Sequence, residues 1–190
     1  MDINEKTKLK IAYSMKELME HSSLSKISVK DIVENAHLTR QTFYRYFKDK
    51  YDCVNWYFER VAQMSFKQLG NGVDLEEGLI KKFELLKKDQ RFFYEAFMAD
   101  DQNSLFQYDY DCIYEFYSHI LLDKLGELNG EIDFLLKMYC KGSIDMTFEW
   151  VKNGMKLSEK EFAHLLIEAM PMKLQMYLLN KKIHKKSDRR

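Results

Sequence analysis

The sequence contains few residues that interrupt helices. Its 190 residues include one proline and seven glycines, with no glycine-rich or proline-rich tract. Proline breaks a helix by removing a backbone donor, and glycine weakens one through its conformational freedom. Their scarcity predicts an all-α fold.

Long apolar runs and paired cysteines are also missing. No run approaches the roughly 18–20 residues that span a bilayer. The N-terminal stretch MDINEKTKLK lacks the apolar core of a signal peptide. Cys53, Cys112 and Cys140 lie far apart and form no CxxC pair. These absences predict a cytoplasmic protein with reduced thiols and no membrane partner.

Signatures of catalysis and of cofactor or metal binding are missing as well. The sequence contains no glycine-rich phosphate loop, no GxSxG and no HExxH. Cys112 and His119 lie seven residues apart and would share a helical face, but two residues do not make a zinc site. We therefore expect no enzyme, no cofactor and no bound metal.

The net charge of zero conceals blocks of opposite sign. Residues 37–50 carry four basic side chains against Asp49 alone, and residues 92–123 carry seven acids with no Lys or Arg. The last ten residues carry six basic side chains against one acid. Such blocks indicate different partners for different parts of the chain.

Two helix starts near the N-terminus share one capping pattern. Ser28 and Thr39 each follow an apolar residue that stands five positions before another, the spacing of a hydrophobic staple. A short helix ending near Ala36 leaves only His37 and Leu38 for the turn before the next helix. Two short helices with so tight a turn predict a helix-turn-helix, although this turn lacks the glycine it often contains.

Further helices are expected on both sides of this motif. Gly70–Gly72 is the clearest linker, and Pro171 should kink or end the last helix. The expected ranges, the first of them capped by Asn4, are about 4–20, 50–69, 74–88, 90–99, 104–125, 131–153 and 158–180.

The helix that starts after Thr39 has one apolar side and a basic outer side. Phe43 and Phe47 share the apolar side. Arginine can bond guanine twice, glutamine can do the same with adenine, and Tyr, Lys and Thr bond phosphate oxygens. A solvated helix whose tyrosines pack on a neighbour is the alternative, but the caps and the tight turn favour DNA binding. The outer side carries Arg40, Gln41, Thr42, Tyr44, Arg45, Tyr46 and Lys48.

The stretch ISVKDIVENAHLTRQTFYRYFKDKYD resembles the DNA-binding domain of TetR-type bacterial regulators. Thr39 to Lys50 fit the family pattern (S/T)-x-x-(T/S)-(F/L)-Y-x-(Y/H)-F-x-x-K. Many members carry glycine where this sequence has Gln41, so its base readout is expected to differ. The resemblance implies base contacts by Thr39, Arg40, Gln41 and Arg45, and phosphate contacts by Ser28, Tyr44, Tyr46, Lys48 and Lys50.

The later part resembles a branch of this family that includes the activator of dihydroxyacetone kinase operons. Gly142, Trp150, Gly154 and Ser158 loosely match the spacing of that branch. The resemblance supports the fold and the subgroup, but it identifies no effector. It implies an N-terminal helix-turn-helix domain, an effector-binding and dimerisation domain, and a basic tail, in residues 1–50, 51–182 and 183–190.

One helix-turn-helix reads too few base pairs, so the resemblance also implies a homodimer on a near-palindromic double-stranded operator. The last two helices are the candidates for its interface. The alternative is that their apolar residues only close the core of one subunit. The expected contacts are Phe148, Val151, Leu165, Leu166, Met170 and Leu174.

The middle of the chain is rich in aromatic residues that could line an effector pocket. With Asp111 and Glu115 nearby, such walls favour a cationic, partly apolar ligand. Ordinary core packing beneath an acidic outer face is the alternative. The function we expect is that of a ligand-responsive repressor. The first alternative is an activator that recruits a coactivator protein, and the second is an enzyme or scaffold unrelated to DNA. The candidate pocket residues are Phe93, Phe97, Tyr110, Tyr114, Tyr117 and Trp150.

Overall fold

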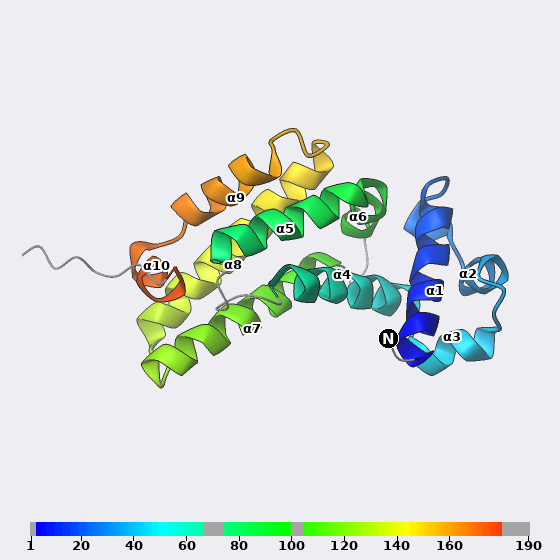
Figure 1. Cartoon of the computed structure of the whole chain (residues 1–190), viewed down its shortest axis with the longest axis horizontal. Helices are drawn as coiled ribbons and strands as arrows, with labels where there is room; N and C mark the ends of the chain where they lie inside the picture. The colour runs from blue at the N-terminus through cyan, green and yellow to red at the C-terminus, as the bar shows by residue number, and fades with distance from the viewer. Residues whose placement is uncertain (1–2, 67–73, 100–104, 180–190) are drawn as a thin grey trace, which may run out of the picture.

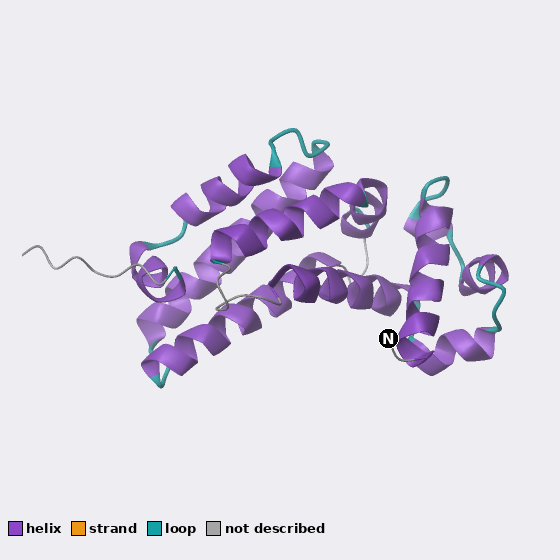
Figure 2. Ribbon diagram, viewed as in Figure 1, coloured by secondary structure: helices purple, strands orange, loops and turns teal. Residues whose placement is uncertain are grey.

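The computed structural model describes residues 3–66, 74–99 and 105–179, and within these ranges it confirms the all-α prediction. Every regular element there is helical (Figure 2). One 3-10 turn, η1 (Leu24–Lys26), lies between the first two α-helices. The α-helices are α1 (Ile3–Met19), α2 (Val29–Asn35), α3 (Arg40–Tyr46), α4 (Lys50–Phe66), α5 (Leu75–Lys88), α6 (Gln90–Phe97), α7 (Leu105–Leu125), α8 (Gly130–Lys152), α9 (Glu159–Glu168) and α10 (Met172–Leu178).

Helices α1–α3 form one end of the molecule, and α4 runs from there into the larger bundle of α5–α10 (Figure 1). The small end has its own apolar centre. Met15 of α1, Ile32 of α2 and Phe43 of α3 are fully buried in it. The apolar positions expected from helical spacing therefore hold the three-helix end together.

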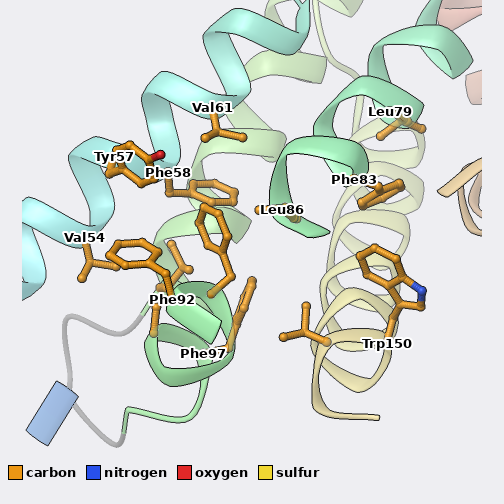
Figure 3. Packing of buried hydrophobic residues seen from close by; sticks show 14 of the residues in the cluster. Val54, Tyr57, Phe58, Val61, Leu79, Phe83, Leu86, Phe92, Phe97 and Trp150 are labelled. Atoms are coloured by element: carbon orange, nitrogen blue, oxygen red, sulfur yellow. The ribbon is translucent and has the colours of Figure 1, made fainter. Parts of the chain in front are cut away.

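The larger bundle is centred on aromatic side chains from several helices (Figure 3). The rings of Trp150 and Phe162 stack in parallel with centroids 4.9 Å apart, and Phe83 lies 4.7 Å from Phe162. Aromatic pairs at these distances contribute about 0.5–1.5 kcal/mol beyond the burial of their area. These contacts tie α5, α8 and α9 into one layer.

Two contacts join the bundle to α1. Asp89, between α5 and α6, forms an ion pair with Lys16 of α1 and accepts a hydrogen bond from Tyr57 of α4 at 2.7 Å. Arg91 of α6 donates to the backbone oxygen of Met19 at the end of α1. The α5–α6 junction therefore contacts α1 directly, and Tyr57 joins α4 to the same carboxylate.

Some helix ends differ from the sequence expectation. Asn4 lies inside α1 rather than at its cap. The expectation that Pro171 kinks or ends the last helix is confirmed, because α9 ends at Glu168 and Pro171 caps a separate helix, α10, with φ −51°. Proline lacks a donor and crowds the preceding turn, so the chain ends α9 and starts again. The expected linker Gly70–Gly72 and the expected basic tail 183–190 lie outside the described residues.

Over the described ranges, no helix combines the length and the apolar character needed to cross a membrane.

Candidate DNA-binding surface and ligand cavity

Helix α2 begins with a complete capping box. The Ser28 hydroxyl accepts a hydrogen bond from the Asp31 backbone N–H at 3.2 Å, and Asp31 Oδ2 accepts one from the Ser28 backbone N–H at 2.8 Å. The hydrogen bonds from Ser28, side chain first and backbone second, hold the pKa of Asp31 below its usual value. The cap leaves Ser28 exposed at the start of α2, where an anion would also meet the helix dipole.

The turn between α2 and α3 is a Schellman motif without glycine. The backbone N–H of Leu38 bonds the carbonyl of Val33 at 2.8 Å, and that of His37 bonds the carbonyl of Glu34 at 3.1 Å. These are the two hydrogen bonds of that motif. His37 adopts φ 49°, the left-handed conformation that usually selects glycine. The missing glycine therefore does not prevent the turn.

Helix α3 is fixed at its start by a cap and along its length by two rings. The Thr39 hydroxyl accepts a hydrogen bond from the Thr42 backbone N–H at 3.1 Å. Phe43 is fully buried, and Phe47, just past the helix, lies 5.7 Å from Trp56 of α4 between ring centroids. These contacts orient α3 against α4 and leave its other side uncovered.

The uncovered side of α3 is basic and carries no acid. Tyr44 is 51% exposed, and nothing in α3 offsets the charge of the two arginines. Guanidinium and amide side chains match the hydrogen-bonding edges of bases in the major groove. We call this set the basic face of α3; it consists of Arg40, Gln41, Tyr44, Arg45 and Lys48, which are all exposed.

Two residues expected at DNA phosphates instead face the protein. The Tyr46 hydroxyl donates to Asn4 of α1 at 3.0 Å. The Lys50 ammonium donates to three backbone carbonyls around η1, at 2.7, 2.9 and 3.1 Å. Both side chains are only partly exposed. Tyr46 therefore bonds α1, and Lys50 holds the backbone around η1, within the three-helix end.

A cavity of about 530 Å³ lies among α4, α5 and α7. Most of its wall is apolar, with aromatic and aliphatic side chains from all three helices. Burial raises the pKa of the Cys112 thiol in this wall to about 11, so the thiol is protonated at neutral pH. The lining residues are Phe58, Glu59, Ala62, Gln63, Phe66, Leu79, Lys82, Asp109, Cys112, Ile113, Glu115, Phe116, Tyr117, His119, Ile120 and Asp123.

Lys82 and Asp109 form a buried ion pair in the cavity wall. Lys82 Nζ lies 3.0 Å from Asp109 Oδ1, and the two side chains are 5% and 0% exposed. The same ammonium lies 4.9 Å from the centroid of the Phe58 ring. Burial raises the pKa of the Asp109 carboxyl, while the charge of Lys82 opposes that shift.

The structure brings only one of the six candidate pocket residues to this cavity. Tyr117 lines it. Tyr110 and Tyr114 stack on each other 6.0 Å apart, and the Tyr114 hydroxyl donates to Asp133 of α8 at 2.5 Å. Figure 3 shows Phe97 and Trp150 in the core; these two and Phe93 are buried and absent from the cavity wall.

Sequence reasoning missed the buried ion pair of Lys82 and Asp109 in the cavity wall. One signal was available for Lys82, because it lies three and four positions from Leu79 and Leu86 on the apolar side of α5. A lysine on an apolar stripe indicates a buried partner. Asp109 gave no such signal, since it stands among several acids in the sequence.

The six residues expected at the dimer interface differ in how far they are buried. Leu165 is 53% exposed and Phe148 is partly buried, whereas the other four are buried in the subunit's own core. The alternative of a closed core therefore applies to Val151, Leu166, Met170 and Leu174.

A different apolar stripe is exposed on α8. Phe134, Met138 and Met146 are 64%, 59% and 55% exposed, and they lie on one side of the helix at multiples of four residues. Gly142 continues the row, and a Cβ added there would meet no atom within 4 Å. We call Phe134, Met138, Gly142 and Met146 the α8 stripe.

No group of three or more His, Cys, Asp or Glu in the described residues is arranged to hold a metal ion.

The fold and the basic face of α3 define the class of helix-turn-helix proteins. Residues 15–55 match the tetR family of bacterial regulatory proteins, and residues 74–171 match a family described as a transcriptional regulator C-terminal region. The chain belongs to the tetR family of bacterial transcriptional regulators, as its sequence predicted.

A curated relative is the HTH-type dhaKLM operon transcriptional activator DhaS of Lactococcus lactis subsp. lactis (strain IL1403). It is 30% identical over 90 residues, which are 47% of this chain and 48% of that protein, so the match spans about half the length of the relative. A solved structure of the dihydroxyacetone kinase operon activator DhaS has a TM-score of 0.67 at 20% identity, covering 90% of this chain and 98% of that one.

Two further solved structures share the fold. A TetR transcriptional regulator from Streptococcus agalactiae 2603V has a TM-score of 0.60 at 22% identity, covering 92% of this chain and 95% of that one. The Thermus thermophilus repressor FadR, solved in complex with lauroyl-CoA, has a TM-score of 0.56 at 14% identity, covering 86% and 92%.

Proposed function

We propose that this regulator binds a double-stranded DNA operator through the basic face of α3. The main support for this proposal is that the basic face of α3 is exposed and contains no acidic residue, while the opposite side of the helix packs against α4. The contacts divide into two kinds. Arg40, Gln41 and Arg45 would meet base edges with Thr39 and Thr42 at the helix start, and Ser28, Tyr44 and Lys48 would meet phosphates.

Tyr46 and Lys50 are left out of the proposed DNA contacts. Their polar atoms are already bonded to Asn4 and to the backbone around η1. The proposal assigns DNA binding to residues 1–50 and the remaining functions to residues 51–182. Because the operator lies on the bacterial chromosome, the regulator would act in the cytoplasm.

We also propose that two copies of the chain bind a near-palindromic operator. A pair of α3 helices must enter successive major grooves about 34–36 Å apart to read such a site. The α8 stripe and Leu165 of α9 supply an exposed apolar surface for a symmetric contact between copies. Gly142 would let two α8 helices approach closely. This surface replaces the buried residues expected from sequence.

The cavity supports a ligand-responsive mechanism. Phe58, Ala62 and Phe66 of α4 form part of its wall, and α4 begins at Lys50, directly beyond α3. A ligand that moves α4 would change the distance between the two α3 helices of a dimer. To act, the ligand must bind the two spacings with different affinity; a 100-fold difference corresponds to about 2.7 kcal/mol.

A ligand-dependent change in the spacing of the two α3 helices could produce either repression or activation of a target gene. The solved FadR structure contains lauroyl-CoA and is named a repressor, whereas DhaS is named an activator. The open cavity favours a small-molecule effector over a C-terminal domain that acts only by recruiting a coactivator protein. We propose the ligand-responsive repressor first and the activator second.

The test is fluorescence anisotropy with the DNA directly upstream of the gene, at two salt concentrations and with random DNA as competitor. The proposal expects tight binding that survives the competitor and weakens steeply with salt, because phosphate contacts release counterions. A systematic selection from random DNA would cover operators elsewhere. Affinity equal to that for random DNA in both assays would overturn the proposed function.

A further inference from the structure

Asp109 is the only buried carboxylate of the cavity wall with one oxygen bonded and the other unpaired, among the residues the structure describes. Oδ1 bonds Lys82 Nζ at 3.0 Å. Oδ2 is buried, and no described residue donates a hydrogen bond to it. A buried acceptor without a hydrogen-bond donor is destabilising, so nearly all such atoms in folded proteins have a partner. The missing donor can come from a molecule in the cavity.

The rest of the cavity indicates what that molecule looks like. Its wall is mainly apolar, with the rings of Phe58, Phe66 and Phe116 among its residues. Its volume of about 530 Å³ falls within the range of roughly 300–1,000 Å³ found for small-molecule sites. An apolar body carrying one polar head group would match both the wall and the single unpaired oxygen.

The charges around the cavity disfavour an anion. The ion pair of Lys82 and Asp109 is neutral as a unit. The other lining groups that can carry charge near neutral pH are three carboxylates and one imidazole, from Glu59, Glu115, Asp123 and His119. Burial raises the pKa of the Cys112 thiol and of the Tyr117 hydroxyl, so both groups are neutral at pH 7. A carboxylate head group would meet this excess of negative charge, and it has no proton to donate to Asp109 Oδ2.

We infer that the cavity binds an apolar molecule with a hydrogen-bond-donating head group, either a hydroxyl or a primary ammonium, that bonds Asp109 Oδ2. Molecules whose head group only accepts hydrogen bonds, such as ethers and carboxylates, are discriminated against. This inference rests on the proposed function of the cavity as an effector site. It assigns Asp109 as the specificity-determining residue and Lys82 as the residue that holds it.

Isothermal titration calorimetry on the full chain without DNA tests the inference. The probes share one apolar body: 4-phenylbutan-1-ol, 4-phenylbutylamine, the methyl ether of the alcohol, and 4-phenylbutyrate. The alcohol and the amine should bind about 10-fold more tightly than the ether, a difference of about 1.4 kcal/mol, and 4-phenylbutyrate should bind most weakly. Equal affinity for the alcohol and the ether, or no binding of any probe, would overturn the inference.

Substitutions at the pair sharpen the test. In Asp109→Asn the amide oxygen would stay with Lys82, which can only donate, and the amide N–H groups would take the place of Oδ2. The preference should then reverse, with the ether bound more tightly than the amine. Asp111→Asn is the matched control, since Asp111 is exposed on the same helix and is absent from the cavity wall. It should leave all four affinities unchanged.

A second variant covers the case in which Asp109→Asn does not fold because Lys82 loses its counter-charge. Replacing the pair as Lys82→Met with Asp109→Leu removes both charges, which proteins often tolerate. This variant should bind the alcohol and the ether equally, within twofold. A retained 10-fold preference for the alcohol would place the head group elsewhere and overturn the inference.

The assays separate the two proposals. Calorimetry without DNA reports only on the cavity, and anisotropy with operator DNA reports on regulation. A probe that binds as expected but leaves operator affinity unchanged would support the inference and count against the ligand-responsive mechanism. If no probe binds, but other molecules change operator affinity, the inference would be overturned and the ligand-responsive mechanism supported.

Discussion

The Tyr57 hydroxyl donates a 2.7 Å hydrogen bond to Asp89 Oδ2, and this bond joins α4 to the junction of α5 and α6. The other oxygen of Asp89 is bound by Lys16 of α1. One carboxylate thus connects α4, the α5–α6 junction and α1 of the three-helix end. Desolvation and the neighbouring Asp89 raise the pKa of Tyr57, so the hydroxyl remains a donor.

Tyr57→Phe should lower the free energy of unfolding by about 1–2 kcal/mol, because it leaves a buried carboxylate oxygen without its donor. Urea unfolding would measure this. Tyr13→Phe is the control, since Tyr13 is 49% exposed and its hydroxyl is not part of this bond. Equal stability of wild type and Tyr57→Phe would show that the bond contributes nothing to holding α4 against the α5–α6 junction.

Arg40→Ala and Lys48→Ala should weaken DNA binding in different ways. If Arg40 contacts guanine, its loss should cost about 1–3 kcal/mol on the operator and relax the sequence preference. Loss of Lys48 should weaken operator and random DNA alike and reduce the salt dependence. Anisotropy with both DNAs distinguishes the two. An equal loss on both DNAs for Arg40→Ala would refute its role in reading bases.

His37→Gly should stabilise the protein by up to about 1 kcal/mol. His37 has φ 49°, a conformation that is strained by roughly 1–2 kcal/mol for residues with a Cβ, while glycine adds some entropy to the unfolded chain. Thermal unfolding would show the gain as a higher Tm. His21→Gly, in an exposed turn without positive φ, is the comparison and should not stabilise.

Met138→Lys should dissociate the proposed dimer by placing a charge at the centre of the α8 stripe. Sedimentation equilibrium at micromolar concentrations would show the loss of the dimer. Met64→Lys on α4 is the matched control, because Met64 is similarly exposed at 55% against 59% for Met138. A dimer that survives Met138→Lys unchanged would place the interface elsewhere.

Gly78→Ala should close part of the cavity. A Cβ at Gly78 would lie 2.5 Å from Cδ1 of Phe66, so the ring must move, and Phe66 lines the cavity. Overpacking of this kind costs about 1–3 kcal/mol. Calorimetry should show weaker binding of 4-phenylbutan-1-ol, whereas Gly130→Ala, which meets no atom within 4 Å, should not change it. Unchanged affinity in Gly78→Ala would mean that this end of the cavity is unused.

Local patterns predicted the helix-turn-helix well, because its caps and its apolar spacing lie within a few residues of each other. The Ser28 box and the Thr39 cap both form. The cavity was not predictable in this way. Its wall combines Phe58, Lys82 and Asp109 from three helices, and sequence spacing within one helix does not determine which faces of different helices meet.

The same limit explains the dimer residues. Apolar spacing along α9 cannot tell a residue that packs into its own subunit from one that faces a second copy. Leu165 and Leu166 are neighbours in sequence, yet one is 53% exposed and the other 6%. The α8 stripe carried a readable signal, because Phe134, Met138 and Met146 recur at multiples of four residues.

The two tryptophans give the protein one intrinsic fluorophore beside α3 and one in the core of the larger bundle. Trp56 packs against Phe47 at the end of α3, with the Lys8 ammonium 5.4 Å from its ring centroid. Trp150 is buried in the bundle and donates from its ring N–H to the backbone oxygen of Leu157 at 3.1 Å. With Trp150→Phe the emission would report on the DNA-binding end alone, and with Trp56→Phe on the bundle alone. Tryptophan fluorescence of these variants could thus show, without an attached dye, whether binding of a molecule in the cavity changes the structure around α3.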